Sequence, residues 1–252
     1  MHTESLRVTH IRQLLADRLK QQKFTSVNRE ASMTSLTGNT TIELVNASFI
    51  ADEDSLFGEV NWDYVRREEE WYESMSRSVE DIPGGAPKIW SAVADKIGRI
   101  NSNYGWCIYS EDNEDQFENV VKELVKNPES RRAVMIYTRP SMWTDYNYKG
   151  RSDFMCTNAV QYLIRDGALH AIVQMRSNDS IFGYRNDRAW QQHVLEKVAL
   201  NVRAPAGNLF WNVGSLHVYA RHYYLVDHYN KTGEIHITKE QYALRYPNSE
   251  YK

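Results

Sequence analysis

Residues 153–190 decide the fold, and they read DFMCTNAVQYLIRDGALHAIVQMRSNDSIFGYRNDRAW. Two runs rich in apolar and β-branched residues, 159–164 and 168–173, flank the pair Asp166-Gly167. Glycine accepts positive φ, so this pair favours a two-residue hairpin turn. The stretch is therefore predicted to form two paired antiparallel strands.

The outer ends of these two strands carry Cys156 and Arg176. Pairing about the turn brings the two side chains together, and a guanidinium beside a thiol favours the thiolate. Cys156 is therefore the candidate nucleophile. The other cysteine is Cys107, and two cysteines exclude both a disulfide framework and a cysteine-rich zinc site.

The composition is that of a globular protein with one large core. The chain has 252 residues, of which 42% are hydrophobic and 12% aromatic, and we expect one domain over residues 1–252. The net charge of −3 is mixed along the chain, which argues against a dedicated nucleic-acid-binding protein or a membrane-surface protein. No signal-peptide core or membrane span is visible, so a cytoplasmic location is expected.

Periodicity outside the hairpin predicts alternating helices and strands. Helices are expected at 8–23, 60–75 and 88–97, around Phe117–Leu124, from near Asp187, and in a short tail segment after Thr238. Strands are expected at 41–49, 133–137 and 209–219. Residues 24–39 and the aromatic stretch 101–106 are expected to be loops, the second of a kind that lines pockets.

The helix at 60–75 contains three consecutive glutamates, Glu68, Glu69 and Glu70. At 100° per residue they cannot share one face, so at least one should point inward with Tyr64 and Trp71. The ordinary interpretation of such a run is a solvated face. A buried carboxylate here would be a candidate acid or base.

Other polar residues have both an ordinary and a functional interpretation. Arg131 and Arg132 precede a strand, where they are either solvated or available for bidentate contacts with a phosphate. Asp187 lies where a helix cap is expected. His217 and His222 suggest a metal pair, but no third ligand has a recognisable spacing, so no metal site is predicted.

Taken together, these segments resemble the thymidylate synthase superfamily, most closely its branch of phage-type deoxycytidylate 5-hydroxymethylases. The likeness covers nearly the whole chain. Its markers follow in family order: Glu68-Glu69-Glu70-Trp71, Trp90, Asn103-Tyr104-Gly105, Ser130-Arg131-Arg132, Cys156, Arg176-Ser177-Asn178-Asp179, Gly183 and His217-Val218-Tyr219.

The resemblance implies a single α/β (α+β) domain around a large, mostly antiparallel twisted sheet flanked by helices, paired back to back in a homodimer. It implies that Arg131 and Arg132 cross to the partner's active site, where they join the other nucleotide-binding residues. The implied nucleotide-binding set is Arg29, Arg131, Arg132, Arg176, Ser177, Asn178, Asp187, His217, Tyr219 and Tyr104. Arg29 lacks the family's usual Arg-Thr-Gly surroundings.

The resemblance also implies a reaction. Cys156 would add to carbon 6 of a pyrimidine ring, and the activated carbon 5 would attack a one-carbon unit from 5,10-methylenetetrahydrofolate, the co-substrate. Trp90, Asp179 and Gly183 would lie on the folate side. Glu68 would orient or deprotonate a water molecule, which would make the product a hydroxymethyl group and the second product tetrahydrofolate. Met155-Cys156-Thr157 stands where a synthase has Pro-Cys-His, which favours the hydroxymethylase branch.

The implied substrate depends on Asp187, which stands where a uracil-using synthase has asparagine. A carboxyl group suits the amine and bare ring nitrogen of cytosine, so dCMP is the expected substrate. A shift of one residue would put Asn186 in this position and restore a uracil reader. The alternatives are a CMP hydroxymethylase, a dUMP hydroxymethylase or thymidylate synthase, and, in another class, a catalytically silent nucleotide- or RNA-binding protein.

Overall fold

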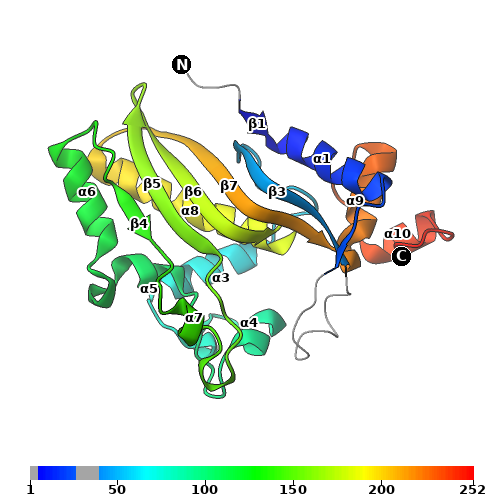
Figure 1. The fold of residues 1–252 in the computed structure, drawn as a ribbon, viewed down its shortest axis with the longest axis horizontal. Helices are drawn as coiled ribbons and strands as arrows, with labels where there is room; N and C mark the ends of the chain where they lie inside the picture. Colours follow the sequence, from blue (N-terminus) through cyan, green and yellow to red (C-terminus); the bar gives the residue numbers. More distant parts are fainter. Residues whose placement is uncertain (1–4, 27–39) are drawn as a thin grey trace. The chain divides into compact units, whose positions relative to one another are not determined.

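The computed structural model describes residues 5–26 and 40–252 (Figure 1). The chain divides into two compact units. The first contains Met1–Val60, Ser177–Arg188 and Trp211–Lys252, and the second contains Asn61–Arg176 and Ala189–Phe210. Three of the four boundaries fall inside elements, which therefore contribute residues to both units: strand β6 (Ala168–Asp179), helix α8 (Phe182–Val202) and strand β7 (Ala206–Tyr219). Whether the chain is one domain stays a prediction.

The strands pair in the order β1-β3-β7-β6-β5-β4, with β2 on β3. β1 and β3 are parallel, whereas β2–β3, β4–β5 and β5–β6 are antiparallel. The expected mostly antiparallel sheet is confirmed, and the parallel β1–β3 pair makes it a mixed sheet. The bounds of the strands are β1 Leu6–Arg7, β2 Thr25–Ser26, β3 Thr40–Ile50, β4 Val134–Ile136, β5 Thr157–Arg165, β6 Ala168–Asp179 and β7 Ala206–Tyr219.

The β5–β6 hairpin has the register that its sequence predicts. Arg165 pairs with Ala168 across the turn, and Asp166 and Gly167 have φ of 49° and 78°. Positive φ at both central residues is the requirement of the tight hairpin turn that matches strand twist. Near the other end, a register shift between Thr157 and Ala159 marks a β-bulge.

The helices differ widely in length. Their bounds are α1 Val8–Lys20, α3 Trp62–Glu73, α4 Lys88–Val93, α5 Tyr104–Tyr109, α6 Gln116–Lys126, α7 Met142–Asp145, α8 Phe182–Val202, α9 Tyr223–Thr232 and α10 Lys239–Arg245. Short 3-10 turns occur at η1 Val79–Asp81, η2 Glu111–Asn113, η3 Tyr148–Gly150 and η4 Ala220–His222.

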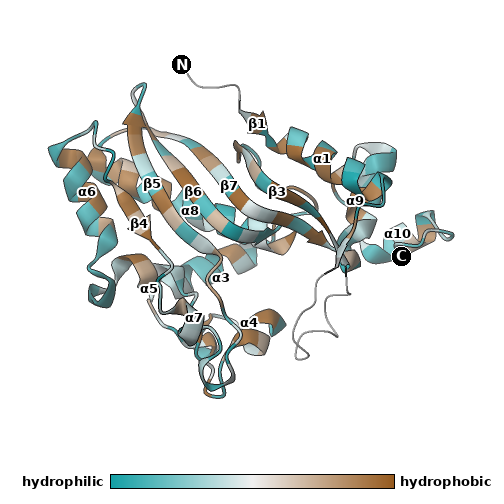
Figure 2. Ribbon diagram, in the orientation of Figure 1, coloured by the Kyte–Doolittle hydropathy of each residue, from teal (hydrophilic) through white to brown (hydrophobic). Residues whose placement is uncertain are grey.

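Each unit has its own hydrophobic core. In the first unit α1 buries most of the apolar face predicted from its spacing, including Val8, Ile11 and Leu15, whereas Leu14 is 43% exposed. In the second unit aromatic rings pack in series, with Tyr72 5.4 Å from Tyr104 and 4.9 Å from Trp190. Figure 2 shows that hydrophobic residues also recur along β5, β6 and β7.

Several predicted boundaries are wrong, among them the end of the helix expected at 8–23, which is Lys20, and the loop expected at 24–39, which contains β2. Three further differences lie close to the predicted site residues. The helix expected at 88–97 ends at Val93, because the buried Asp95 accepts hydrogen bonds from the backbone N–H of Ile97 and Arg99 and so holds a turn. The expected loop at 101–106 instead enters α5, whose N-cap is Asn103. The helix expected to begin near Asp187 begins at Phe182, so Asp187 lies inside it and is not its N-cap.

Candidate active site

The candidate nucleophile Cys156 lies immediately before β5 and is partly exposed. Arg176 Nη2 is 3.6 Å from Cys156 Sγ, as the hairpin predicts. The same guanidinium donates to the carbonyls of Met155 at 2.8 Å and Phe154 at 2.6 Å. Three contacts therefore fix Arg176 beside the sulfur, where its positive charge favours a thiolate.

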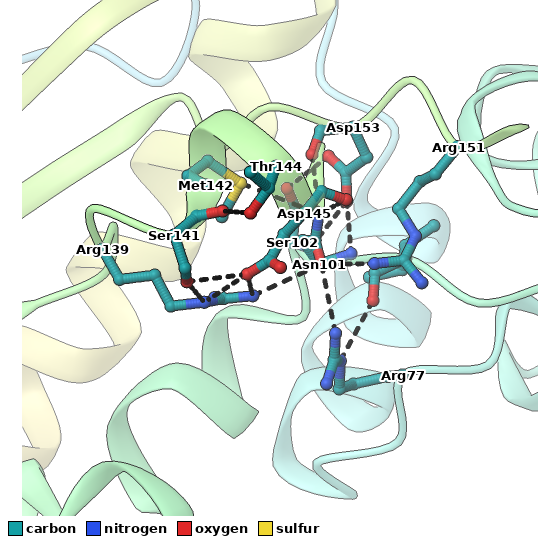
Figure 3. A network of polar contacts seen from close by, with 11 residues as sticks. Arg77, Asn101, Ser102, Arg139, Ser141, Met142, Thr144, Asp145, Arg151 and Asp153 are labelled. Atoms are coloured by element: carbon teal, nitrogen blue, oxygen red, sulfur yellow. Dashed lines mark hydrogen bonds and ion pairs between the residues drawn. The ribbon is translucent and has the colours of Figure 1, made fainter. Parts of the chain in front are cut away.

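A buried polar network holds the segment that leads to Cys156 (Figure 3). Asp153 accepts hydrogen bonds from the backbone N–H of Asn101 and Ser102, at 2.5 and 2.8 Å, and from Ser102 Oγ at 2.5 Å. Asn101 Oδ1 in turn accepts from Arg77 at 3.1 Å and Arg151 at 2.5 Å. Because all of these groups except Arg77 are buried, and they satisfy one another's hydrogen bonds, the network restrains the backbone ahead of the nucleophile.

Glu68 is the glutamate of the run on α3 that points inward, and its side chain is buried. Tyr64 Oη donates to Glu68 Oε1 at 2.5 Å, and Trp90 Nε1 donates to the same oxygen at 3.2 Å and to Tyr64 Oη at 2.8 Å. Burial raises the pKa of Glu68 to about 7, although these two donors act in the opposite direction. Such a carboxyl group can exchange a proton near neutral pH.

The remaining predicted residues of the second unit differ in burial: Tyr104 is buried, whereas Arg131 and Arg132 are exposed. Tyr104 is buried and its hydroxyl accepts from Thr157 Oγ1 at 3.0 Å, next to the nucleophile. Arg131 and Arg132 are exposed ahead of β4, and Arg132 forms an ion pair with Glu123 at 3.0 Å. The two arginines thus lie on the surface of this chain.

In the first unit, Asp187 is hydrogen-bonded to Asn178, which is in turn hydrogen-bonded to Trp211. Asn178 Nδ2 donates to Asp187 Oδ2 at 2.7 Å, and Trp211 Nε1 donates to Asn178 Oδ1 at 3.3 Å. Asn178 and Trp211 are both buried. Gly183 packs against this group, since a Cβ there would lie 3.1 Å from Asn178 Nδ2.

The other predicted residues of the first unit lie at the end of β6 and on β7. Asp179 Oδ1 accepts from the backbone N–H of Ile181 at 3.0 Å, and Ser177 precedes it on β6. The rings of His217 and Tyr219 are 4.8 Å apart on β7, edge to face. Arg29 lies outside the described residues.

His222, the other histidine considered for a metal pair, is a buried ring next to Phe182. Its ring lies 5.1 Å from that of Phe182, and burial lowers its pKa to about 4. Over residues 5–26 and 40–252, no group of three or more His, Cys, Asp or Glu side chains is arranged to hold a metal ion.

A family model described as thymidylate synthase matches residues 31–243. The chain belongs to the thymidylate synthase family. Among its relatives, this thymidylate synthase family member is 53% identical to the deoxycytidylate 5-hydroxymethyltransferase of Enterobacteria phage T4, over 98% of this chain and 100% of that protein. It is 54% identical to the enzyme of the same name from Enterobacteria phage T6, over 96% and 98%.

More distant relatives of this family member carry the name thymidylate synthase. The protein of Bacillus subtilis subsp. natto is 27% identical over 65% of this chain and 59% of that protein. The solved structure of thermostable thymidylate synthase A from Bacillus subtilis matches with a TM-score of 0.67 at 20% identity, over 87% of this chain and 83% of that chain. That likeness confirms the predicted fold. No helix within residues 5–26 and 40–252 is long and apolar enough to cross a membrane.

Sequence reasoning missed several residues of this thymidylate synthase family member that surround the predicted ones. Tyr64 was expected to face inward but was given no role, and it is a donor to Glu68. Trp211, Asn101 and Asp153 were given no role of their own, although each is buried with a polar atom that requires a partner. Their spacing in the sequence gives no signal, because their partners are distant along the chain.

Proposed function

We propose that this chain is a deoxycytidylate 5-hydroxymethylase, which transfers a hydroxymethyl group to carbon 5 of dCMP from 5,10-methylenetetrahydrofolate and water. The observation that carries the proposal is the full-length identity of 53% with the enzyme of phage T4 that has this name. The products would be 5-hydroxymethyl-dCMP and tetrahydrofolate. The cytoplasm of a host cell is the proposed location, since the two relatives compared at this level come from phages.

Cys156 is the proposed nucleophile. Its sulfur would form a bond to carbon 6 of the ring, and the electron pair of the 5,6 double bond would become available at carbon 5. The neighbouring Arg176, 3.6 Å from Sγ, supports this role because a fixed cation stabilises the thiolate that attacks. After substitution at carbon 5, loss of the carbon 5 proton and elimination of the sulfur would restore the ring and the thiolate.

Glu68 is the proposed group that activates water. A carboxyl group with a pKa of about 7 is partly ionised at neutral pH and can accept a proton from a water molecule that attacks the one-carbon unit on carbon 5. Tyr64 and Trp90 both donate to Oε1 and so fix the orientation of the carboxyl plane. This fixed orientation supports the hydroxymethylase chemistry over a purely structural role.

Methylenetetrahydrofolate would supply a carbon at the oxidation level of formaldehyde. Trp90, Asp179 and Gly183 are the residues proposed to bind it. Trp90 fits an aromatic ligand, since its ring packs edge-on against Trp71 at 5.3 Å and α4 has no buried residue. Ile89 on the same helix is half exposed. An apolar surface of this kind suits a flat pterin.

Asp187 is the proposed reader of the base. The amine of cytosine would donate to its carboxylate, and one proton would be shared between the carboxyl group and the ring nitrogen. We predict that Asp187→Asn moves the preference toward dUMP, because an amide matches the uracil edge. Steady-state kinetics with both nucleotides test this prediction, and an unchanged ratio of kcat/KM would refute the assignment of Asp187.

Arginines are the proposed ligands of the nucleotide phosphate, and a homodimer is the proposed assembly. Arg176, Ser177 and Arg29 would come from one chain, and Arg131 and Arg132 from the partner. Tyr104, Asn178, His217 and Tyr219 complete the proposed nucleotide-binding set. The exposure of the Arg132 guanidinium, 80%, supports a role outside its own chain, although it also contacts Glu123.

The decisive experiment is incubation of the purified chain with methylenetetrahydrofolate and, in parallel, dCMP, CMP or dUMP. Mass spectrometry of the nucleotide should show a gain of CH₂O on dCMP. The same gain on CMP alone would establish a ribonucleotide enzyme, and a gain of CH₂ on dUMP with formation of dihydrofolate would establish a synthase. The absence of any product would favour the remaining alternative, a catalytically silent binding protein.

Cys156→Ser provides the matching test of mechanism. Release of tritium from carbon 5 of labelled dCMP requires covalent activation of the ring, so this variant should release none. Cys107→Ser is the control, because Cys107 is fully buried and burial raises the pKa of its thiol to about 12. Full tritium release by Cys156→Ser would refute the covalent mechanism.

A further inference from the structure

Asn178 is buried between the proposed base reader and an indole ring. Its side-chain amide spans the two, with 2.7 Å to Asp187 Oδ2 on one end and 3.3 Å to Trp211 Nε1 on the other. An indole N–H can only donate, so the end of the amide that faces Trp211 must be its oxygen. The end that faces Asp187 is therefore the NH₂ group, a donor.

Gly183 keeps this arrangement in place from the side of α8. A Cβ on residue 183 would approach Asn178 Nδ2 to 3.1 Å and Asp179 Cβ to 3.3 Å, which is closer than these neighbours can accept without moving. Asn178 is 2% exposed and Trp211 is fully buried. The donor is thus held by packing as well as by its hydrogen bonds.

A hydrogen-bond donor of fixed orientation affects which protonation state a carboxyl group adopts, and the protonation state determines which pyrimidine the group can bind. An ionised carboxylate offers two acceptors, which suits the amine of cytosine and a protonated ring nitrogen but opposes the carbonyl oxygen of uracil. A protonated carboxyl group offers a donor and an acceptor, as an amide does, and it therefore suits uracil. A hydrogen bond donated to the carboxylate favours its ionised form.

We propose that Asn178 is the positioning residue that makes Asp187 selective for cytosine: its amide, oriented by Trp211, holds the carboxyl group in the ionised, acceptor-only form. The proton shared in the complex then lies on the ring nitrogen. Asn178 acts through Asp187 in this role, which differs from the direct contact with substrate that the family resemblance implies. The inference rests on the proposed function.

Asn178→Asp is the sharpest test, because it preserves shape and the acceptor for Trp211 while it removes the donor. Two carboxyl groups at this distance share a proton, which makes residue 187 a better match for uracil. The ratio of kcat/KM for dCMP to kcat/KM for dUMP, measured as tritium release from carbon 5, should fall by about 10- to 100-fold, the range expected for a hydrogen bond to a charged group.

A second pair of variants keeps the test informative if Asn178→Asp folds poorly. Trp211→Phe removes the indole donor that orients Asn178, and it should lower the ratio of kcat/KM for dCMP to kcat/KM for dUMP by less than Asn178→Asp does. The double variant Asn178→Asp, Asp187→Asn restores one amide–carboxyl hydrogen bond, so its melting temperature should exceed that of Asn178→Asp alone. Asn201→Ala, an exposed amide on α8 bonded to the Lys197 carbonyl, is the control and should leave the ratio unchanged.

The possible results separate this inference from the proposed function. If the unaltered chain fails to release tritium from dCMP, the proposed function is wrong. Suppose that the unaltered chain is active and that Asn178→Asp lowers kcat/KM equally for dCMP and dUMP, so that their ratio is unchanged. Asn178 then has a structural role only, and the inference is overturned. A selective fall in the ratio supports it.

Discussion

Glu68 combines burial with ionisation near neutral pH. Burial raises the pKa of its carboxyl group from 4.5 to about 7 in the folded chain. Between these two values the folded state binds more protons than the unfolded state, so the free energy of unfolding falls as the pH rises through this window. The energetic equivalent of such a shift is on the order of 3 kcal/mol.

Glu68→Gln should therefore stabilise the protein while it removes the proposed base. The free energy of unfolding of this variant, measured by urea denaturation, should exceed that of the unaltered chain above pH 7, and the difference should shrink toward pH 4.5. Formation of the hydroxymethyl product should be lost. Glu70→Gln, an exposed neighbour on α3, should change neither quantity, and an equal effect of both substitutions would contradict the burial argument.

Tyr64 tunes the same carboxyl group. Its hydroxyl donates to Glu68 Oε1 and thereby lowers the Glu68 pKa, so Tyr64→Phe should raise that pKa further. The acid limb of the pH profile for kcat should move to higher pH, because the proposed base must be ionised. Tyr148→Phe, on an exposed tyrosine, is the control, and a profile identical to the unaltered chain in Tyr64→Phe would exclude the tuning role.

At the scale of elements, the segment before β5 depends on Asp153. Asp153→Ala would leave two backbone N–H groups and the Ser102 hydroxyl buried without their acceptor. The expected loss is roughly 2–4 kcal/mol of unfolding free energy, with slower alkylation of Cys156 by iodoacetamide. Asp112→Ala, an exposed aspartate in η2, is the control; unchanged alkylation in Asp153→Ala would show that the network does not position the thiol.

The elements that the sequence predicts well are those determined by local chemistry. The β5–β6 hairpin follows from Asp166-Gly167, and helical geometry predicts that at least one of the three glutamates on α3 is buried, which Glu68 is. The end of α4 depends instead on Asp95, whose carboxylate also pairs with Arg151 at 2.9 Å, over fifty positions away in the chain. Hydrophobic periodicity carries no information about such a partner.

The candidate site was predictable in part for the same reason. The approach of Arg176 to Cys156 follows from the register of one hairpin. The bond between Asn178 and Asp187 depends on where α8 begins, and the start of that helix was predicted five residues too late. The assigned roles of both groups stay predictions until the substitutions are measured.

At the scale of the whole molecule, the order of the family's markers predicted the fold that the solved relative confirms. Assembly was predicted from the resemblance alone, and a homodimer with Arg131 and Arg132 crossing to the partner is still a proposal. A chain taken singly gives no evidence of a crossing residue, because the groups that such a residue would bind belong to another copy.

Subunit mixing tests the proposed crossing. Cys156→Ser and Arg132→Ala homodimers should each be nearly inactive, but mixed dimers concentrate both lesions in one site and leave the other intact. Refolding an equal mixture should recover roughly a quarter of the unaltered activity, since half the dimers are mixed and each has one good site. High activity of Arg132→Ala alone, or no recovery on mixing, would refute the crossing.

The bulge at Asn158 sets the side of the sheet on which the thiol emerges. Side chains alternate along a strand, so odd and even positions lie on opposite faces. Thr157 and Val160 are both buried although three positions separate them, because the extra residue between Thr157 and Ala159 reverses the count. Cys156 is thereby kept off the face of Val160. Deleting Asn158 would remove the bulge but leave Cys156 on the face opposite Val160, because Thr157 and Val160 would then be two positions apart. The bulge therefore absorbs one residue that would otherwise move the thiol to the other side of the sheet.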